Sequence, residues 1–137
     1  MKELLYSDLT YKIRKAVFNV YNTLGYGHKE QIYQKALSEE FNQLNILHKV
    51  QPNINVLYKD KNVGHYVPDF LVEGKIIIEI KALEIFPISL EKQIVYYLKG
   101  TGYKLGLLIN FGSSKLIIKR LIWTTSQSGK QNIRVNP

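Results

Sequence analysis

Two charged residues interrupt an apolar segment near the middle of the chain. Residues 76–82 read Ile-Ile-Ile-Glu-Ile-Lys-Ala, and the alternation of a strand places Glu79 and Lys81 on one face, opposite Ile78 and Ile80. Burying an unpaired carboxylate is costly, so Glu79 needs a cation, a hydrogen-bond donor or water. The same pattern also fits a half-exposed strand on which Glu79 and Lys81 are solvated and inert.

A second carboxylate, Asp69, is expected to lie beside Glu79. Residues 69–72 and 75–82 are expected to form two neighbouring strands. If a three-residue turn centred on Gly74 joins them, it pairs residues whose numbers sum to 148, and Asp69 lies opposite Glu79. Directly opposed Cβ atoms are about 4.5–5.5 Å apart, and carboxylates that close repel unless a cation bridges them or one is protonated. The pair therefore predicts a site for a hard divalent cation such as Mg²⁺ or Mn²⁺. Lys81 would orient or deprotonate a water there, or offset charge in a phosphoryl transition state.

Hydrophobic periodicity predicts the elements that must position these residues. The expected helices cover residues 7–24, 29–45 and 88–99, and Ser7 or Asp8 would cap the first of them. The expected strands cover residues 53–58, 63–67, 69–72, 75–82, 104–110 and 115–123. This order predicts a mixed sheet with helices packed on it, a layered α/β domain.

The net charge of the chain is +8, and it all comes from the C-terminal third. Acidic and basic residues balance up to Glu91, and no acid follows. Such one-sided charge suits a polyanion, because each neutralised phosphate releases condensed counterions; a lysine-rich solvated surface is the alternative. The residues expected to hold nucleic acid are Lys99, Lys104, Lys115, Lys119 and Arg120.

The composition, with 45% hydrophobic and 22% charged residues, is that of an ordinary globular protein. It predicts a single domain over residues 1–125 and a polar tail over residues 126–137 whose composition favours mobility. The absence of cysteine excludes disulfides, thiolate zinc sites and cysteine nucleophiles. No segment approaches the roughly 20 apolar residues of a membrane span, so we expect a cytoplasmic protein with no membrane partner.

Several motifs resemble those of one nuclease superfamily. Pro68-Asp69, followed by Glu79-Ile80-Lys81, is similar to the P-D…(D/E)-x-K signature of the restriction-endonuclease-like, or PD-(D/E)xK, nucleases. Residues 27–33, Gly-His-Lys-Glu-Gln-Ile-Tyr, resemble the motif of the GxxExxY proteins, a branch of that superfamily. The resemblance continues through residues 107–112 and covers residues 9–123 in the expected order.

This resemblance implies a three-layer α/β/α restriction-endonuclease-like fold with a central mixed β-sheet and a Mg²⁺ (or Mn²⁺) centre. It also implies that an acid from an early helix joins the metal site. Glu30 fits, because its spacing of three from Tyr33 places it on an inward-facing stripe. A capping role is the alternative, since Gly27 as N-cap would make Glu30 the third helical residue. Tyr33 is expected to pack.

A further element, Gln93-Ile94-Val95-Tyr96-Tyr97, resembles the Q-x-x-x-Y element of the RecB-like nucleases, which lies on a helix beside the metal site. A spacing of four brings Gln93 and Tyr97 onto one helical face. The amide would hold a ligating carboxylate or a phosphate, and the phenol would donate a second hydrogen bond. Both residues would otherwise be ordinary residues of an exposed helix surface.

The leading hypothesis is a Mg²⁺-dependent nuclease that hydrolyses phosphodiester bonds in DNA rather than RNA, with a homodimer as one expected assembly. Its candidate catalytic residues are Asp69, Glu79, Lys81, Glu30, Gln93 and Tyr97, of which Asp69, Glu79 and Glu30 would bind metal. The alternative is a catalytically inactive module on the same fold that binds nucleic acid or a partner. A third hypothesis is a structural protein unconnected with nucleic acid.

Overall fold

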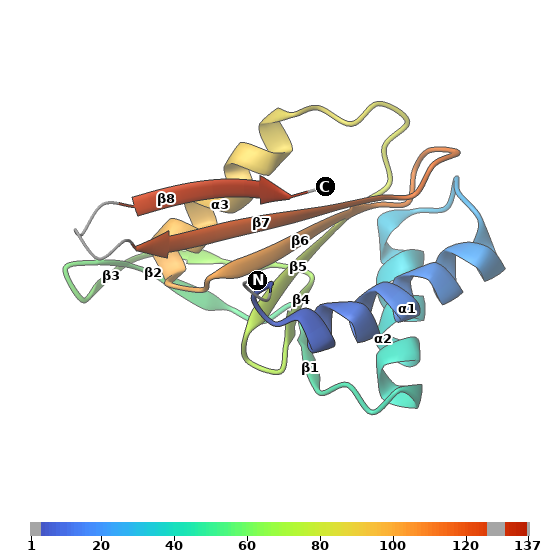
Figure 1. Cartoon of the computed structure of the whole chain (residues 1–137), viewed down its shortest axis with the longest axis horizontal. Coiled ribbons are helices and arrows are strands. Elements are labelled where there is room, and N and C mark those ends of the chain that lie inside the picture. Colours follow the sequence, from blue (N-terminus) through green and yellow to red (C-terminus); the bar gives the residue numbers. More distant parts are fainter. Residues whose placement is uncertain (1–3, 126–130, 137) are drawn as a thin grey trace.

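The computed structural model describes residues 4–125 and 131–136 (Figure 1). Its helices are α1 (Ser7–Leu24), α2 (Glu30–Gln43) and α3 (Ser89–Thr101). Its strands are β1 (His48–Val50), β2 (Ile54–Tyr58), β3 (Lys61–Tyr66), β4 (Phe70–Val72), β5 (Ile76–Lys81), β6 (Leu105–Asn110), β7 (Ile117–Thr125) and β8 (Gln131–Asn136).

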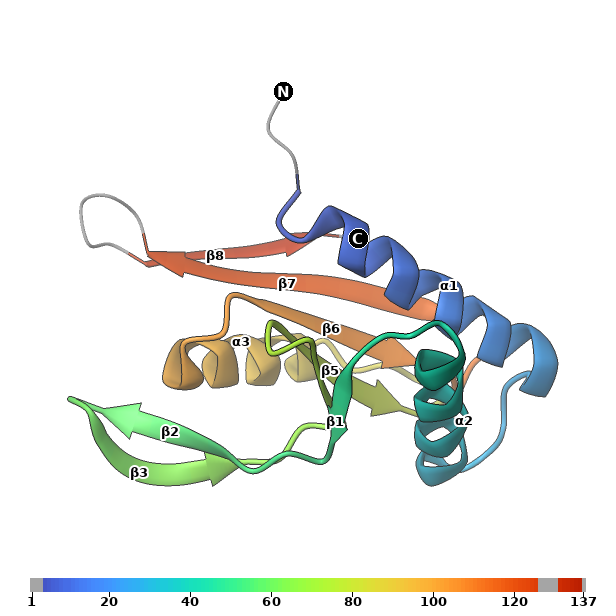
Figure 2. The ribbon, with the colours of Figure 1, turned by 90° about the horizontal axis from the view of Figure 1, so that it is seen from below.

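Six strands form one central sheet in the order β1-β4-β5-β6-β7-β8, and β2 and β3 form a separate two-stranded ribbon. Strands β5 and β6 run parallel, with α3 connecting them, and the other neighbours in the sheet are antiparallel. Figure 2 shows α1 and α2 on one side of the sheet and α3 with the ribbon on the other. The predicted three-layer α/β/α fold with a central mixed sheet is therefore confirmed.

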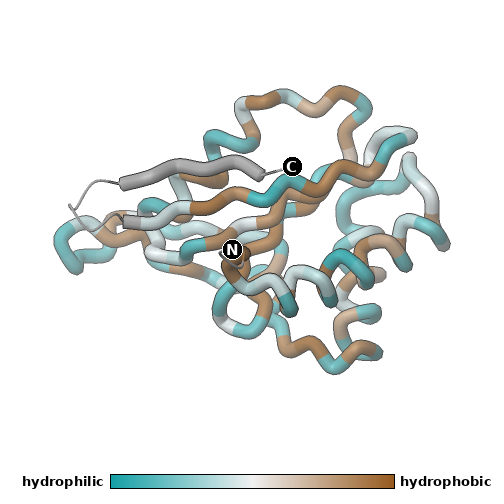
Figure 3. Tube along the Cα trace, viewed as in Figure 1, coloured by the Kyte–Doolittle hydropathy of each residue, from teal (hydrophilic) through white to brown (hydrophobic). Residues whose placement is uncertain are grey.

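Each face of the sheet has its own hydrophobic core. The core beneath α1 and α2 takes Ile76, Ile78 and Ile80 from β5, whereas the core beneath α3 takes Ile77 from the same strand. Consecutive residues of a strand point to opposite faces, so β5 contributes to both cores. Strand β6 is buried along its whole length, and in Figure 3 the central strands are largely brown. This agrees with the apolar run expected of a strand covered on both faces.

The helix starts differ from those expected. Tyr6, in the left-handed region at φ 55°, is the N-cap of α1 and makes no side-chain cap, so the prediction that Ser7 or Asp8 caps this helix was wrong. Ser7 lies inside the helix, and its carbonyl accepts a hydrogen bond of 3.0 Å from Thr10 Oγ1. Lys29, not Gly27, is the N-cap of α2. Gly27 has a φ of +103°, which is incompatible with the extended conformation of an N-cap.

The sequence pattern did not predict β1 or β8. Residues 131–136 of the expected tail form β8, which pairs antiparallel with β7. Residues 126–130 and 137 of that tail lie outside the described residues. Within the described part of the chain, no helix has the length and apolarity needed to cross a membrane.

Candidate active site

The β4–β5 hairpin brings Asp69 to the end of the strand that carries Glu79. The pairs Phe70 with Ile78 and Val72 with Ile76 confirm the predicted register. Asp69 precedes β4 directly, and its Oδ2 accepts a hydrogen bond of 2.7 Å from the backbone N–H of Ile80. The carboxylate is thus fixed against the backbone of β5, beside Glu79.

A side chain from α2 holds the other oxygen of this carboxylate. Gln34, which is 9% exposed, donates from Nε2 to Asp69 Oδ1 over 2.7 Å. The amide carries no charge, so it orients the carboxylate without neutralising it. Asp69 is therefore held in a fixed direction by Gln34 and by the backbone of β5.

Glu79 is half-buried on the α3 face of β5, the face that also carries Lys81. Its Oε1 accepts a hydrogen bond of 3.0 Å from the Tyr66 hydroxyl. Burial, and after it the neighbouring Asp69 carboxylate, raise the pKa of Glu79 to about 7. The hydrogen bond from Tyr66 and the charge of Lys81 act in the opposite direction but do not cancel this increase. In the absence of a cation the two carboxylates thus destabilise one another.

Tyr66, near the end of β3, connects Glu79 to α3. Its ring stacks on Tyr97 with centroids 3.7 Å apart and planes inclined by 5°. Burial, followed by the charge of Glu79, raises the pKa of Tyr66 well above its usual range. The phenol therefore stays protonated and remains a donor to the carboxylate. Tyr97 is therefore linked to Glu79 indirectly, through the ring of Tyr66.

These residues surround a cleft of about 230 Å³ between the base of the β2–β3 ribbon, β5 and α3. It is lined by His65, Tyr66, Val67, Glu79, Lys81, Gln93, Ile94 and Tyr97. The structure thus brings four of the six predicted catalytic residues to one cleft or its edge, with Asp69 adjoining Glu79 as a fifth. Gln93 is exposed at the mouth, one helical turn before Tyr97.

The segment that follows Lys81 is anchored to the end of β6. Asn110, which is fully buried, accepts a hydrogen bond of 2.9 Å from Leu83 N–H and donates one of 2.9 Å to the Leu83 carbonyl. A Cβ added at Gly112 would lie 2.0 Å from the Leu83 nitrogen, so only glycine allows this approach. The chain is therefore held firmly two residues beyond Lys81.

The predicted sixth residue, Glu30, does not face inward. Its side chain is exposed in the first turn of α2, so the prediction of an inward-facing Glu30 was wrong. The inward stripe begins one turn later at Tyr33, which is fully buried and stacks on Phe111 at a centroid distance of 4.4 Å. Tyr33 packs as expected. In residues 4–125 and 131–136, no three His, Asp or Glu side chains form a group that could hold a metal ion.

Two carboxylates nevertheless suit the metal that the resemblance implies. Asp69 and Glu79 offer hard oxygen donors from adjacent positions, and the raised pKa of Glu79 shows that burial and Asp69 disfavour its charged form when no cation offsets them. Such donors match the preference of Mg²⁺ and Mn²⁺, which commonly take one or two carboxylates and keep several waters. The donor set therefore fits a hard divalent cation without Glu30.

The five predicted nucleic-acid contacts, all of which lie within the described residues, do not form one patch. Arg120 is 3% exposed, and its Nη2 donates to the Leu5 carbonyl beneath α1, so its prediction as a nucleic-acid contact was wrong. Burial and the charge of Arg14 lower the pKa of Arg120. Lys104 and Lys115 are exposed beyond opposite ends of β6.

The remaining two predicted contacts lie on the α3 side of the molecule. Lys99 is exposed on α3, with its Nζ 5.3 Å from the ring centroid of Trp123. Lys119 is half-buried and pairs in register with Leu108, which pairs in turn with Glu79. Of the five predicted contacts, Lys119 is thus the one whose strand register matches that of Glu79, two strands away.

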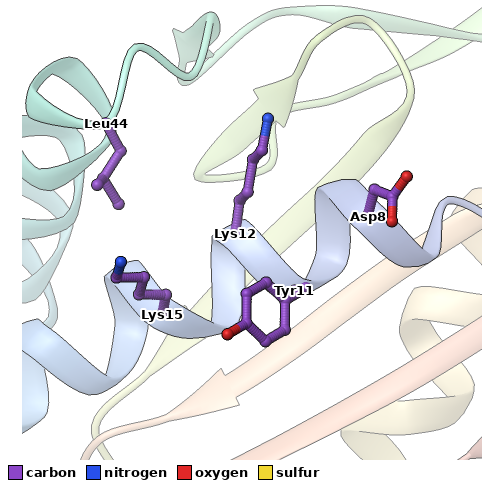
Figure 4. A pocket seen from close by; sticks show the side chains of 5 residues that line it. All are labelled: Asp8, Tyr11, Lys12, Lys15 and Leu44. Atoms are coloured by element: carbon purple, nitrogen blue, oxygen red, sulfur yellow. The ribbon is translucent and has the colours of Figure 1, made fainter.

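A larger hollow, of about 480 Å³, lies between α1 and the end of α2 (Figure 4). It is lined by Asp8, Tyr11, Lys12, Lys15 and Leu44. Its lining contains one carboxylate and two lysines, so the hollow lacks the paired acids of the cleft beside β5. Size alone does not identify the active site.

Sequence reasoning missed Gln34 and Tyr66. A signal for Gln34 existed, because it precedes Leu37 and Phe41 on the buried stripe of α2 at helical spacing. A polar residue on such a stripe needs a partner. Tyr66 had no comparable signal, since only the folding of the ribbon against α3 brings it to Glu79.

Comparison with known protein families gives a match over most of the chain. The family model described as the PD-(D/E)XK nuclease superfamily matches residues 7–121. The matched region begins with α1, ends within β7 and includes every residue of the cleft. No curated protein and no solved structure matches the chain.

Proposed function

Since the chain belongs to the PD-(D/E)XK nuclease superfamily, we propose that it is a metal-dependent nuclease whose centre is Asp69, Glu79 and Lys81. The observation that carries this proposal is the pair of carboxylates held side by side at the cleft, of which Glu79 has a pKa of about 7 because of burial and Asp69. Two neighbouring carboxylates that repel one another unless a positive charge offsets them are the arrangement expected where a cation binds.

In this centre Asp69 and Glu79 hold Mg²⁺ or Mn²⁺. The ion, when bound, supplies Lewis-acid polarisation of the phosphodiester. Gln34 and Tyr66 orient the two carboxylates through their hydrogen bonds. Lys81 lies on the same face of β5 and lines the cleft, where its ammonium positions the attacking water or offsets charge on the phosphoryl oxygens. Gln93 holds the backbone of the substrate at the mouth of the cleft.

The proposed substrate is DNA. The net charge of +8 favours a polyanion such as DNA. The GxxExxY branch of the superfamily is the proposed subfamily, on the motif at residues 27–33.

The test is cleavage of single-stranded and duplex DNA and RNA with Mg²⁺ or Mn²⁺ by the unsubstituted protein and by Asp69→Asn. We expect cleavage of DNA that Asp69→Asn abolishes without loss of the fold, as measured by circular dichroism. Glu39→Gln, an exposed acid on α2, is the matched control and should keep full activity. Activity that survives in Asp69→Asn would overturn the assignment of the centre.

One observation favours a second function, a nucleic-acid-binding module without catalysis. The acid expected to complete the metal site, Glu30, is exposed in the first turn of α2. Calorimetric titration with Mn²⁺ separates the two functions. Binding that Asp69→Asn removes supports the nuclease, whereas DNA binding with no metal binding supports the inactive module.

A further inference from the structure

The β2–β3 ribbon is a structural unit apart from the central sheet. It forms its own two-stranded sheet and projects beside α3 (Figure 2). Ile54 and Val56 pack one face of the ribbon into the core beneath α3. At Gly100 a Cβ would lie 2.9 Å from Val56 Cγ1, so helix and ribbon are in close contact. The ribbon is therefore held at its base while its other face is free.

The free face carries groups that both donate and accept hydrogen bonds. Asn55, Asn62 and His65 are all exposed. Asn62 Nδ2 donates to Asn55 Oδ1 across the ribbon over 3.2 Å, and Asn62 Oδ1 accepts from Gly64 N–H over 3.1 Å. These bonds orient the amides without burying them. Exposed amides are the groups that pair with base edges, above all with adenine.

The tip of the ribbon is a tight turn that presents two lysines. Lys59 and Asp60 adopt left-handed conformations with φ of 48° and 66°, and Lys61 begins the returning strand. Both lysines are exposed, and Lys59 Nζ lies 5.3 Å from the ring centroid of Tyr58. Cations in such a position suit phosphates.

The base of the same ribbon forms a wall of the candidate active site. His65, Tyr66 and Val67 line the cleft together with Glu79 and Lys81. From His65 to Lys61, at the start of β3, the strand rises about 13 Å, at about 3.3 Å for each residue. One rigid element thus runs from the cleft to a basic tip, with hydrogen-bonding side chains between them.

We infer that the β2–β3 ribbon enters the major groove of duplex DNA and sets the DNA backbone against the cleft. This inference rests on the proposed nuclease function. The major groove of B-form DNA, about 12 Å wide, admits a two-stranded ribbon, whereas the deep and narrow major groove of A-form RNA does not. The partner is therefore duplex DNA and not duplex RNA.

The alternative occupant of the ribbon is a second copy of the chain. Leu57 and Val63 are exposed at 48% and 64%, and the outer edges of the ribbon offer backbone groups for sheet extension. Lysines at an edge, however, oppose strand pairing between copies. Lys59 and Lys61 favour the polyanion over the second copy.

The experiment measures binding separately from cleavage. Protein carrying Lys81→Ala is titrated, without divalent metal, into a labelled DNA duplex and into an RNA duplex of the same sequence. Lys59→Glu with Lys61→Glu is compared with Lys12→Glu and Lys15→Glu, an equal charge change on α1 (Figure 4). All four lysines are exposed, so the fold should be unaffected, and thermal unfolding verifies this.

We expect the ribbon variant to lose at least tenfold in affinity for duplex DNA, and its salt dependence to fall by about two in log–log slope. The α1 variant should lose less than threefold in affinity for duplex DNA. On duplex RNA, neither variant should lose more affinity than the equal change in net charge accounts for. Retained affinity in the ribbon variant, equal losses in both variants, or no duplex DNA binding by the parent at low salt would each overturn the inference.

Two further outcomes separate this inference from its premises. A dimer that the ribbon variant converts to monomers, as seen by sedimentation, would assign the ribbon to self-association and overturn the inference. Ribbon-dependent binding to duplex DNA by a protein that cleaves nothing with Mn²⁺ would support the ribbon and overturn only the nuclease.

Discussion

The two faces of the central sheet are made by alternate residues of the same strands, yet they differ in kind. On the face covered by α1 and α2, β5 contributes Ile76, Ile78 and Ile80, none more than 1% exposed. On the face covered by α3, the same strand contributes Glu79 and Lys81, which line an open cleft. Packing holds the first face, whereas on the second a hydrogen bond from Tyr66 orients Glu79. Substitutions on the first face should therefore reduce mainly stability, and substitutions of the polar residues on the second should reduce mainly activity.

The largest expected effect is on the open face. Lys81→Met keeps the length of the side chain and removes its charge, so we expect cleavage to fall on the order of 10³-fold, as when a group that stabilises a transition state is removed. The midpoint of thermal unfolding should stay nearly constant, because Lys81 is only half-buried. Initial rates on labelled DNA measure this effect. Lys75→Met, at an exposed lysine before β5, is the control and should keep its rate.

On the closed face the expected loss is in stability. Ile78→Ala removes a fully buried side chain and leaves a cavity, so urea unfolding should show a loss of about 3 kcal/mol. Affinity for Mn²⁺, measured well below the unfolding midpoint, should be unchanged. A variant that unfolds normally but no longer binds metal would contradict the separation of the two faces.

A third prediction concerns the pH dependence of stability. Burial and Asp69 raise the pKa of Glu79 from 4.5 to about 7, so between these values the native state holds a proton that the unfolded chain releases. The stability of the metal-free protein should therefore decrease as the pH rises from 4.5 to 7. Glu79→Gln removes the charge, and it should stabilise the protein by about 2 kcal/mol at pH 8 but not at pH 4.

Denaturant unfolding of the two proteins in a metal-chelating buffer measures this difference. Excess Mn²⁺ should reverse the order of stability at pH 8, since the ion binds the unsubstituted protein more tightly. A Glu79→Gln variant that is less stable than the unsubstituted protein at pH 8 without metal would show that the two carboxylates do not repel.

The smallest expected effect is at the contact between the ribbon and β5. Tyr66→Phe keeps the stack on Tyr97 and removes the hydrogen bond of 3.0 Å to Glu79, so activity should fall about tenfold, with less than 1 kcal/mol lost in stability. The pKa of Glu79 should rise further, as NMR titration can measure. Tyr96→Phe, at an exposed tyrosine on α3, should change neither quantity.

The sequence predicted what depends on local geometry. The turn at Gly74 determines which residues pair across the hairpin, so the positions of Asp69 and Glu79 followed from counting. Alternation along β5 placed Glu79 and Lys81 together. Both rules act over a few residues and need no knowledge of the rest of the fold.

What the sequence did not predict depends on contacts between distant segments. Arg120 lies among apolar residues of both faces of β7, so alternation could not decide whether it points to α1 or to α3. Glu30 shares a helical face with Tyr33, but the core ends at Tyr33, and helical spacing does not show where a core ends. Strand β8 consists largely of polar residues and pairs with β7 through backbone bonds that no side-chain pattern reveals.

The attachment of Leu83 to Asn110 and Gly112 has a consequence for the order of folding. The backbone after Lys81 is held by residues that lie about thirty positions later, at the far end of the last parallel strand. Until β6 has joined β5, these contacts cannot hold the backbone that carries the Lys81 amine. A growing or partly unfolded chain therefore contains the acids and the lysine, but these contacts can hold them in place only after β6 has joined β5.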